Sequence, residues 1–323
     1  MVITYNHEKY IAQALESVLM QETEYNYEIN VIEDCSTDRT QEIILRYKER
    51  FPDKINTYFN PKNIGTLSPP AQKVFYEGFK TLRGDYLAIL EGDDYWTSPQ
   101  KLQQQISFLE AHRDFVACAH NTLKIYEDGS QAPHRFHYVE GNKQVHTVHD
   151  FAAMTSFFHA SSILYRNALR GVPVRAFRSK WSCDIFLTLA HVQYGKLRNF
   201  DEDMSVYRSH KGGNYSNLPE TKGRIYNIEG IRRYNRWLNY KYLKDFSFTI
   251  YRLCLSLIKH AQEGKIAPLT RAERLKYRMV AAFYGKIYDV LDRYPKLDPA
   301  VFWYKESAKS PSPKLERIVG YLG

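Results

Sequence analysis

The first third of the chain alternates short apolar runs with amphipathic stretches, and this alternation constrains the fold more than any other feature. Four apolar runs have the length and composition of buried strands, at residues 2–4, 28–33, 55–59 and 86–90. Apolar residues recur at helical spacing between them, most clearly at residues 7–21 and 71–82. Strands that alternate with helices pair in parallel through right-handed crossovers. We therefore expect an α/β fold whose mostly parallel central sheet is flanked by helices.

The middle of the chain is expected to extend this sheet. Further strands are predicted at residues 115–120, 123–126 and 161–166, and a helix at residues 184–194. The polar segment at residues 127–150 is rich in histidine and contains turn residues, so we expect a loop or an irregular hairpin there.

The fourth apolar run, residues 86–90, stops abruptly at the acidic sequence Glu91-Gly92-Asp93-Asp94. Ligands of open parallel sheets bind beyond the carboxyl ends of the strands, so acids at this place face a site rather than a core. Carboxylate oxygens suit a hard divalent cation, Mg²⁺ or Mn²⁺, which keeps coordination positions open for phosphates. Considered alone, the same residues are explained equally well by an acidic turn before the next helix.

Polar residues follow all four expected strands. They are Thr4-Tyr5-Asn6, Glu33-Asp34, Asn63-Ile64-Gly65 and the acidic sequence that begins at Glu91. Because the carboxyl ends of parallel strands meet at one edge of a sheet, we expect these residues to line a single pocket.

Near residue 222 the expected strands give way to helices. Three helical segments are predicted at residues 222–244, 246–263 and 270–294, the last with a capping box at Thr270 and Glu273. We therefore expect an α/β domain at residues 1–221 and a helical domain at residues 222–323. Basic residues among Tyr and Trp in these helices suit an anionic lipid surface, an acceptor or an oligomer contact; a solvated polar face on an ordinary bundle is the alternative.

Composition adds few constraints. The formal charge of +9 and the pI near 9.1 permit a nucleotide, nucleic acid or acidic membrane as partner without selecting one. Four separated cysteines form no CxxC pair, so neither a zinc knuckle nor a disulfide framework is implied. With no signal peptide or spanning helix expected, we predict a cytoplasmic protein, with peripheral contact at the inner face of the cell membrane as one further expectation.

The motifs in their order resemble those of family 2 glycosyltransferases, which are inverting enzymes with a nucleotide-sugar-binding GT-A fold, a Rossmann-like α/β architecture. The resemblance covers residues 1–215 and rests on the sequences at residues 2–6, 15–21, 33–40, 63–65 and 84–94. It implies a nucleoside-diphosphate sugar as donor and a metal ion, Mn²⁺ or Mg²⁺, as cofactor.

The resemblance also implies roles for residues of the nucleoside pocket. Thr4, Tyr5 and Asn6 would line the nucleobase and ribose, with Asn63 in the same pocket, and Asp34 would hydrogen-bond the base.

Glu91 and Asp93 match the two acids of the family's Asp-x-Asp motif. The resemblance implies that Glu91 holds the ribose and that Asp93 binds the metal on the diphosphate. Glu91 departs from the family pattern, where Asp is more frequent. Asp94 is expected either to contact the donor sugar or to cap the next helix.

Residues 206–213 resemble the family's Tyr-Arg-x-His element. By this resemblance His210 would complete the coordination of the metal, and Arg208 or Lys211 would contact the diphosphate, an interaction suited to a guanidinium or an ammonium group. A surface loop with incidental basic residues is the alternative interpretation.

An inverting transfer needs a base that accepts the proton of the attacking hydroxyl. Asp184 resembles the catalytic carboxylate of the family in its place at the start of a helix, where N-capping is a second and compatible role. Glu202 and Asp203 are the fallback candidates.

These observations together predict an inverting transferase that moves a sugar from a nucleoside-diphosphate sugar, with UDP-sugar as first choice, to a hydroxyl acceptor. The acceptor is expected to be a glycan or lipid-linked glycan in the synthesis of surface polysaccharide or glycoconjugate. A nucleotidyltransferase of sugar phosphates would share the α/β core but needs a glycine-rich phosphate loop, which residues 4–10 lack. A noncatalytic nucleic-acid-binding protein suits the charge but leaves acids at strand ends unexplained, so we expect no nucleic acid partner.

Overall fold

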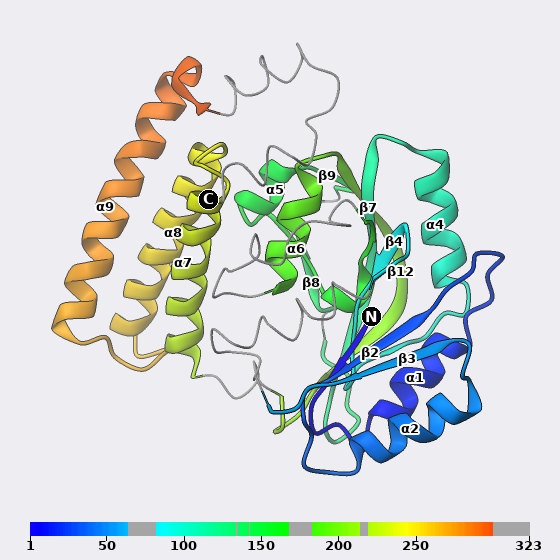
Figure 1. Ribbon diagram of the computed structural model, residues 1–323. Helices are drawn as coiled ribbons and strands as arrows, with labels where there is room; N and C mark the ends of the chain where they lie inside the picture. Colours follow the sequence, from blue (N-terminus) through cyan, green and yellow to red (C-terminus); the bar gives the residue numbers. More distant parts are fainter. Residues whose placement is uncertain (64–81, 134, 142, 168–182, 214–218, 300–323) are drawn as a thin grey trace. The chain divides into compact units, whose positions relative to one another are not determined.

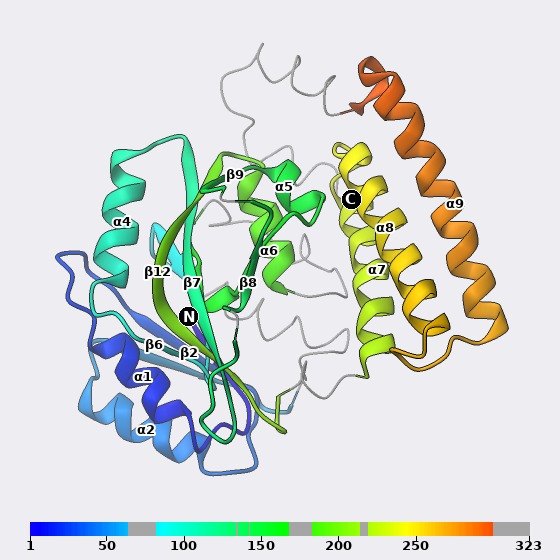
Figure 2. The same cartoon turned by 180° about the vertical axis from the view of Figure 1, so that it is seen from behind.

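Figure 1 shows a computed structural model of the chain, and Figure 2 shows it from behind. The structure describes residues 1–63, 82–133, 135–141, 143–167, 183–213 and 219–299. Two compact units divide the chain: Met1–Val148 with Thr155–Ser216, and His149–Met154 with Asn217–Gly323. The helix expected at residues 71–82 falls, apart from its last residue, outside the described residues.

The first unit contains a four-stranded parallel sheet of order β3-β2-β1-β5. Its strands are β1 (Val2–Thr4), β2 (Ile29–Glu33), β3 (Ile55–Phe59) and β5 (Leu90–Glu91). Helices α1 (Ile11–Leu19) and α2 (Thr40–Arg50) connect them in the predicted alternation. Ile11, Leu15 and Val18 recur at helical spacing and are buried in the core with Val31 and Ile44. The expected parallel sheet flanked by helices is therefore confirmed.

A second, mixed sheet has the order β4-β11-β7-β12-β6, with β9 also paired to β12. Its strands are β4 (Tyr86–Ala88), β6 (Tyr95–Trp96), β7 (Phe115–Tyr126), β9 (Val145–His146), β11 (Leu164–Arg166) and β12 (Lys196–Ser209). The pair β7 and β12 is parallel, whereas the other pairs are antiparallel. Helix α4 (Lys101–Ala111) packs on β7.

The prediction of a single strand at residues 86–90 is wrong in one respect. The chain forms two short strands there, β4 and β5, and passes from one sheet to the other at Ile89. Ala88 pairs with Leu164 in the mixed sheet, while Leu90 pairs with Val2 in the parallel sheet. Ile89 and its neighbours at residues 87 and 90 are buried, so the apolar run carries no sign of the change. The acidic sequence thus begins at the carboxyl end of a strand next to β1, as expected.

Two strands predicted at residues 115–120 and 123–126 form the single strand β7. The polar residues at its centre are buried and paired: Asn121 Nδ2 donates to Asp201 Oδ1 at 2.8 Å, and the Thr122 and Ser205 hydroxyls lie 2.9 Å apart. Buried polar groups that find partners do not interrupt a strand.

The segment predicted as a loop or irregular hairpin at residues 127–150 contains regular structure. It holds β8 (His137–Val139), β9 and the start of α5 (Val148–Ala152). The strand β8 pairs antiparallel with β10 (Ser156–Phe158), and the short helix η1 (Ala160–Ser162) follows. The helix predicted at residues 184–194 corresponds to α6 (Cys183–Val192).

Among its described residues, the second unit holds most of α5 and three long helices that lie side by side in both views (Figures 1 and 2). These are α7 (Glu220–Trp237), α8 (Leu243–Gln262) and α9 (Arg271–Arg293), followed by η3 (Pro295–Leu297). The predicted capping box at Thr270 and Glu273 is confirmed. Helix α7 ends earlier than expected because Asn239 and Tyr240 adopt positive φ angles of 50° and 58°. Among the described residues, no helix is both long enough and apolar enough to cross a membrane.

Candidate functional site

The loops after β1 and β2 are tied together by hydrogen bonds. The amide of Asp34 donates to the Thr4 carbonyl at 3.0 Å, and the amide of Thr37 donates to Asn6 Oδ1 at 2.8 Å. Asn6 has a φ of 54°, a left-handed conformation that asparagine tolerates better than most residues. Buried Glu33 accepts the amide of Ser36 at 2.6 Å. These contacts hold the polar ends of two neighbouring strands at one edge of the sheet.

Asp34 is buried and connects this edge to the loop after β3. Asn60 Nδ2 donates to Asp34 Oδ1 at 3.0 Å, and Asn63 Nδ2 donates to the Asp34 carbonyl at 3.1 Å. Tyr5 is partly exposed, and Asn6 and Asn63 are exposed. The first three of the four loops therefore lie together as expected; the roles of these residues in binding a nucleoside stay predictions.

The turn after β5 fits against β1 because its second residue is glycine. The Gly92 amide donates to the Ile3 carbonyl at 2.8 Å, which holds the backbone in place. A Cβ atom at Gly92 would lie 2.6 Å from Thr4 Oγ1 and 2.9 Å from His7 Nδ1. No side chain fits there, so the turn brings Asp93 directly beside the loop after β1.

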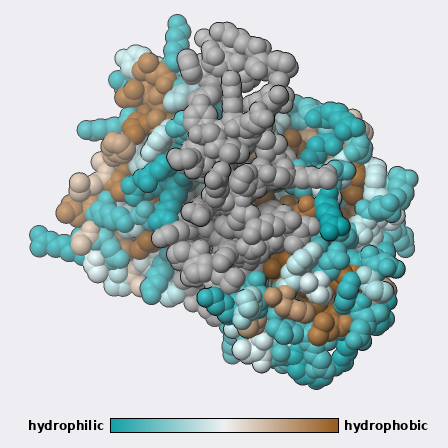
Figure 3. Space-filling model, viewed as in Figure 1, coloured by the Kyte–Doolittle hydropathy of each residue, from teal (hydrophilic) through white to brown (hydrophobic). Residues whose placement is uncertain are grey.

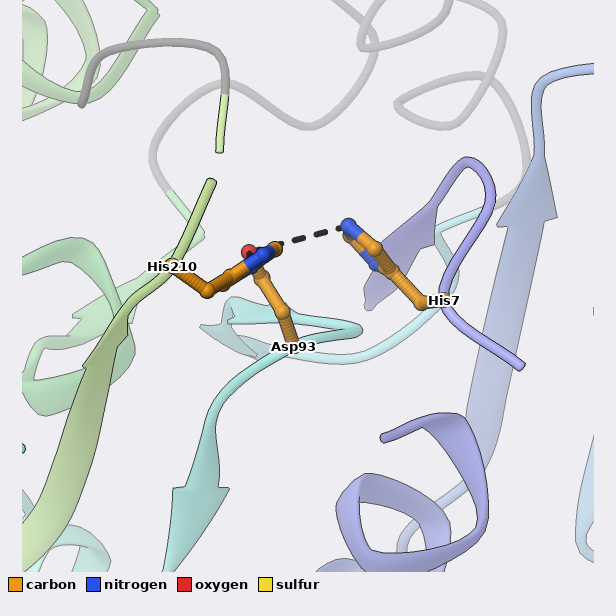
Figure 4. Close-up of side chains that lie close together, drawn as sticks. All are labelled: His7, Asp93 and His210. Carbon is orange, nitrogen blue, oxygen red and sulfur yellow. Dashed lines mark hydrogen bonds and ion pairs between the residues drawn. The ribbon is translucent and has the colours of Figure 1, made fainter. Parts of the chain in front are cut away.

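Three side chains from three separate segments point toward one another at this edge (Figure 4): His7 after β1, Asp93 after β5 and His210 at the end of β12. His210 Nε2 lies 3.0 Å from Asp93 Oδ2, and His7 Nε2 lies 3.6 Å from the same oxygen. One potential ligand atom of each residue lies within 4.8 Å of the other two. Two imidazoles and a carboxylate in this arrangement form a donor set for a divalent cation.

The charges in this group are set by burial and by its own contacts. Burial works against ionisation of Asp93, but the hydrogen bond from His210 and the attraction of a protonated His7 would hold the pKa of its carboxyl below the usual value. Burial lowers the pKa of His7, although Asp93 opposes this change. A carboxylate beside neutral imidazole is the protonation state that a cation requires of its ligands.

The ring nitrogens of the two histidines have different partners. The Thr4 hydroxyl lies 3.2 Å from His7 Nδ1, an outer contact that can orient the ring and leave Nε2 for a cation. At His210 the Gly212 amide donates to Nδ1 at 3.2 Å, so Nε2 carries the hydrogen that is donated to Asp93. Cation binding at His210 Nε2 therefore requires the Gly212 contact to open.

Asp94 points away from this group into a second cluster. It is fully buried, accepts the Ser161 hydroxyl at 2.9 Å and the Arg208 amide at 3.0 Å, and lies 3.6 Å from His159 Nδ1. His159 Nε2 lies 4.0 Å from Glu91 Oε2. Burial, with the nearby Asp93 and Glu91 charges, raises the pKa of Asp94 well above its usual value. These partners tie the acidic turn to η1 and β12; a contact of Asp94 with a donor sugar stays a prediction.

The two basic candidates differ in exposure, since Arg208 is partly buried and Lys211 is exposed. The Arg208 guanidinium lies over the rings of Tyr10 and Tyr95, at 5.0 and 4.5 Å from their centroids, and donates to the Asp93 carbonyl at 2.6 Å and to Gln13. Lys211 is exposed in the turn after β12. Contact of either residue with a diphosphate stays a prediction.

The candidate bases lie on separate elements. Asp184 is the second residue of α6, and its side chain is outside the described part of the structure. Glu202 is exposed on β12, and Asp203 on the same strand pairs with Arg135 Nε at 2.8 Å. The role of Asp184 as base therefore stays a prediction. The Asp203 carboxylate already forms an ion pair with Arg135.

Sequence reasoning missed two histidines of these clusters, His7 and His159. His7 lies just beyond the polar end of β1, at the edge where the other candidates were expected, so its position in sequence was a usable signal. No local pattern marks His159, which reaches the acidic turn only through the pairing of β11 with β4 and β7.

Substitution of Gly92 by alanine is expected to destabilise the fold by about 1–3 kcal/mol or more, because the added methyl overlaps Thr4 and His7. The same variant should lose affinity for Mn²⁺. Denaturant unfolding and a Mn²⁺ titration measure the two effects. The control is Gly129→Ala, which meets no atom within 4 Å but is strained by its φ of 82°, and which should keep Mn²⁺ affinity. Equal losses of Mn²⁺ affinity in both variants would refute the steric argument.

Comparison with known proteins finds a matching family. The family model described as Glycosyl transferase family 2 matches residues 1–172. An uncharacterized protein of Mycobacterium tuberculosis is 32% identical over 213 residues, which cover 65% of this chain and 58% of that protein. The chain thus spans less than two thirds of the length of this curated relative.

Two solved structures share the fold. TarS of S. aureus, solved with UDP-GlcNAc, has a TM-score of 0.50 at 18% identity, covering 88% of this chain and 90% of that chain. The mannosyltransferase PcManGT of Pyrobaculum calidifontis, solved with GDP-Man and Mn²⁺, has a TM-score of 0.51 at 14% identity, covering 91% and 86%. At such identities the likeness establishes the fold alone, and the expected GT-A class is confirmed.

Proposed function

Because the chain belongs to glycosyl transferase family 2, we propose that it transfers a sugar from a nucleoside-diphosphate sugar to a hydroxyl group of an acceptor. The observation that carries the proposal is the group of His7, Asp93 and His210 at the carboxyl ends of the parallel strands. In an α/β sheet this edge is where nucleotides bind. A buried carboxylate between two imidazoles at that edge is a donor set with open positions for a diphosphate.

The donor set suits a divalent cation, with Asp93 and His210 as ligands and His7 as a third. When bound, the ion would neutralise charge that develops on the leaving diphosphate. Mg²⁺ prefers oxygen ligands, whereas imidazole also suits transition metals, so we propose Mn²⁺ before Mg²⁺. Lys211 would add a positive charge at the phosphates.

The edge formed by the first three loops is the proposed nucleoside pocket. The residues that would line it are Thr4, Tyr5, Asn6 and Asn63. Asp34 would hydrogen-bond the nucleobase, and Glu91 would hold the ribose. The donors named with TarS and PcManGT, UDP-GlcNAc and GDP-Man, support a nucleotide sugar as the substrate class. We take a UDP-sugar as the first donor to test.

The chemistry proposed is a single displacement with inversion. Asp184 would accept the proton of the attacking hydroxyl while the nucleotide diphosphate leaves from the opposite face of the sugar. Its place in the first turn of α6 supports this role, because a helix N-terminus favours the ionised form of a carboxyl group.

The acceptor that we propose is a glycan or lipid-linked glycan, in the synthesis of surface polysaccharide or glycoconjugate at the cytoplasmic face of the membrane. This part of the proposal rests on the family and on the basic, aromatic helices of the second unit.

The test is a panel of nucleotide sugars, screened with the full chain for binding and for slow hydrolysis in the presence of Mn²⁺, Mg²⁺ or a chelator. At least one UDP-sugar should bind and hydrolyse with the metal and lose both with the chelator. No metal-dependent response from any nucleotide sugar would contradict the proposed function.

Replacing His7 by glutamine tests the third ligand separately. The Mn²⁺ dissociation constant should rise about tenfold or more, since one of three protein ligands is lost, while Mg²⁺ affinity should change less. Electron paramagnetic resonance of free Mn²⁺ measures this without any turnover. His112→Gln, at an exposed histidine on the end of α4, is the matched control. An unchanged Mn²⁺ affinity in His7→Gln would remove His7 from the ligand set.

A further inference from the structure

Helix α9 is the last of the three long helices described in the second unit, and one of its faces is buried by packing. Tyr277, Ala281, Tyr284 and Leu291 are buried along that face. Gly285 approaches α8 so closely that an added Cβ would lie 3.1 Å from the ring of Tyr251. The inner face of α9 therefore needs no further partner.

The opposite face carries a row of exposed apolar side chains, which we call the outer stripe. Leu275, Met279, Phe283 and Val290 are exposed by 60%, 65%, 61% and 47%. Their spacing of four, four and seven residues places them on one side of the helix. Figure 3 shows hydrophobic residues gathered along α9 among hydrophilic ones. Single exposed apolar residues are ordinary, but a continuous row marks an interaction surface.

Basic side chains accompany the outer stripe along the whole helix. Arg271, Arg274, Arg278, Lys286 and Arg293 are exposed. Within the described part of the chain, none of the five forms an ion pair. The acid Asp289 is also exposed, while Asp292 pairs with Lys244 Nζ at 2.9 Å. Cationic side chains without ion-pair partners can bind anionic groups, and the neighbouring apolar side chains can enter an apolar layer. The two rows together are complementary to a surface with anionic groups outside and an apolar layer beneath.

This combination selects a lipid surface over a second copy of the chain. A two-fold contact between outer stripes would bring the same arginines of two copies together, which like-charge repulsion opposes. The helix has 23 residues, roughly 35 Å in length at 1.5 Å per residue, and it carries apolar residues in most of its turns. It can therefore lie along a membrane surface, the arrangement typical of interfacial amphipathic helices.

We propose that α9 docks on the surface of an anionic lipid bilayer. Leu275, Met279 and Phe283 enter the boundary between headgroups and acyl chains, while Arg278 and Lys286 bind headgroup phosphates. This docking is separate from sugar transfer, so its failure would leave the donor site and its metal untouched.

The experiment is flotation of the full chain with vesicles of phosphatidylcholine alone or mixed with phosphatidylglycerol. The protein should float with the mixed vesicles and stay behind with pure phosphatidylcholine. Leu275→Gln with Phe283→Gln should lower the affinity about tenfold or more, since both side chains leave the interface. Arg278→Gln with Lys286→Gln should lower it about fivefold for each lost cation. Raised salt should weaken vesicle binding by the parent protein more than vesicle binding by this second variant.

Leu45→Gln is the matched control, since Leu45 is a helix residue exposed by 46% in the first unit and should not affect flotation. All variants change exposed side chains, so unchanged circular dichroism is expected. The proposal would be overturned if the parent protein did not bind the mixed vesicles. It would also be overturned if the variant with both Leu275 and Phe283 replaced bound them as well as the parent protein does. Light scattering that shows a dimer of the parent chain which the same two substitutions dissociate would overturn it too, because the outer stripe would then join two copies.

Discussion

Replacement of Asp93 by asparagine is expected to lower sugar transfer by on the order of a thousandfold and to remove measurable Mn²⁺ binding. Asp93 is the one carboxylate within the group of His7 and His210. The asparagine side chain has the same shape as that of aspartate and can still accept the hydrogen bond from His210, so the fold should persist. The loss of transfer and of Mn²⁺ binding would therefore be caused by the missing negative charge. Turnover of the donor identified by the panel and a Mn²⁺ titration measure the two effects.

Asp53→Asn, an exposed aspartate before β3, is the matched control and should change neither quantity. If Asp93→Asn retained full Mn²⁺ affinity, the metal would have to bind elsewhere. The second cluster of Glu91, Asp94 and His159 would then be the next candidate.

Replacement of Asp184 by asparagine should reduce transfer by about 10²–10⁴-fold, the range that general base catalysis supplies. Binding of the donor and of Mn²⁺ should stay unchanged, because no metal ligand is altered. The combination of lost turnover with unchanged donor affinity separates a base from a binding residue. Measurements of kcat and of the donor dissociation constant are both needed.

Asp203→Asn provides the comparison within the same chain. Its carboxylate pairs with Arg135, so its loss should affect stability more than transfer. Full activity of Asp184→Asn together with inactive Asp203→Asn would reassign the base to Asp203.

Part of the fold and site followed from the sequence because it depends on local patterns. Apolar runs and amphipathic helices alternate along the chain, and parallel strands place their carboxyl ends at one edge. That rule places the loops around Thr4, Asp34 and Asn63 together, and the Asp34 backbone indeed donates to Thr4 and accepts from Asn63. The acidic sequence after residue 90 lies at the same edge.

Other features were not predictable because they depend on contacts between distant segments. The chain changes sheets at Ile89, yet both halves of this run are buried and apolar, so no periodicity distinguishes them. His159 reaches the acidic turn through strand pairings made by residues far away in sequence. Asp94 is buried in contact with Ser161 and the Arg208 amide, both distant in sequence, and burial is the main cause of the raised pKa of this carboxyl.

His7 is an intermediate case. Its position after β1 follows from the strand pattern, whereas its distance of 3.6 Å from Asp93 depends on the close approach at Gly92. A glycine required by packing is indistinguishable in sequence from one that allows a turn. The structure separates the two, since the space for a Cβ atom is filled by Thr4 and His7.

The most direct test of the proposed site is an anomalous diffraction map from crystals of the full chain grown with Mn²⁺ and UDP. We predict one strong manganese peak enclosed by His7, Asp93 and His210, in contact with the diphosphate. A peak between Glu91, Asp94 and His159 instead, or bound UDP with no manganese beside Asp93, would contradict the account.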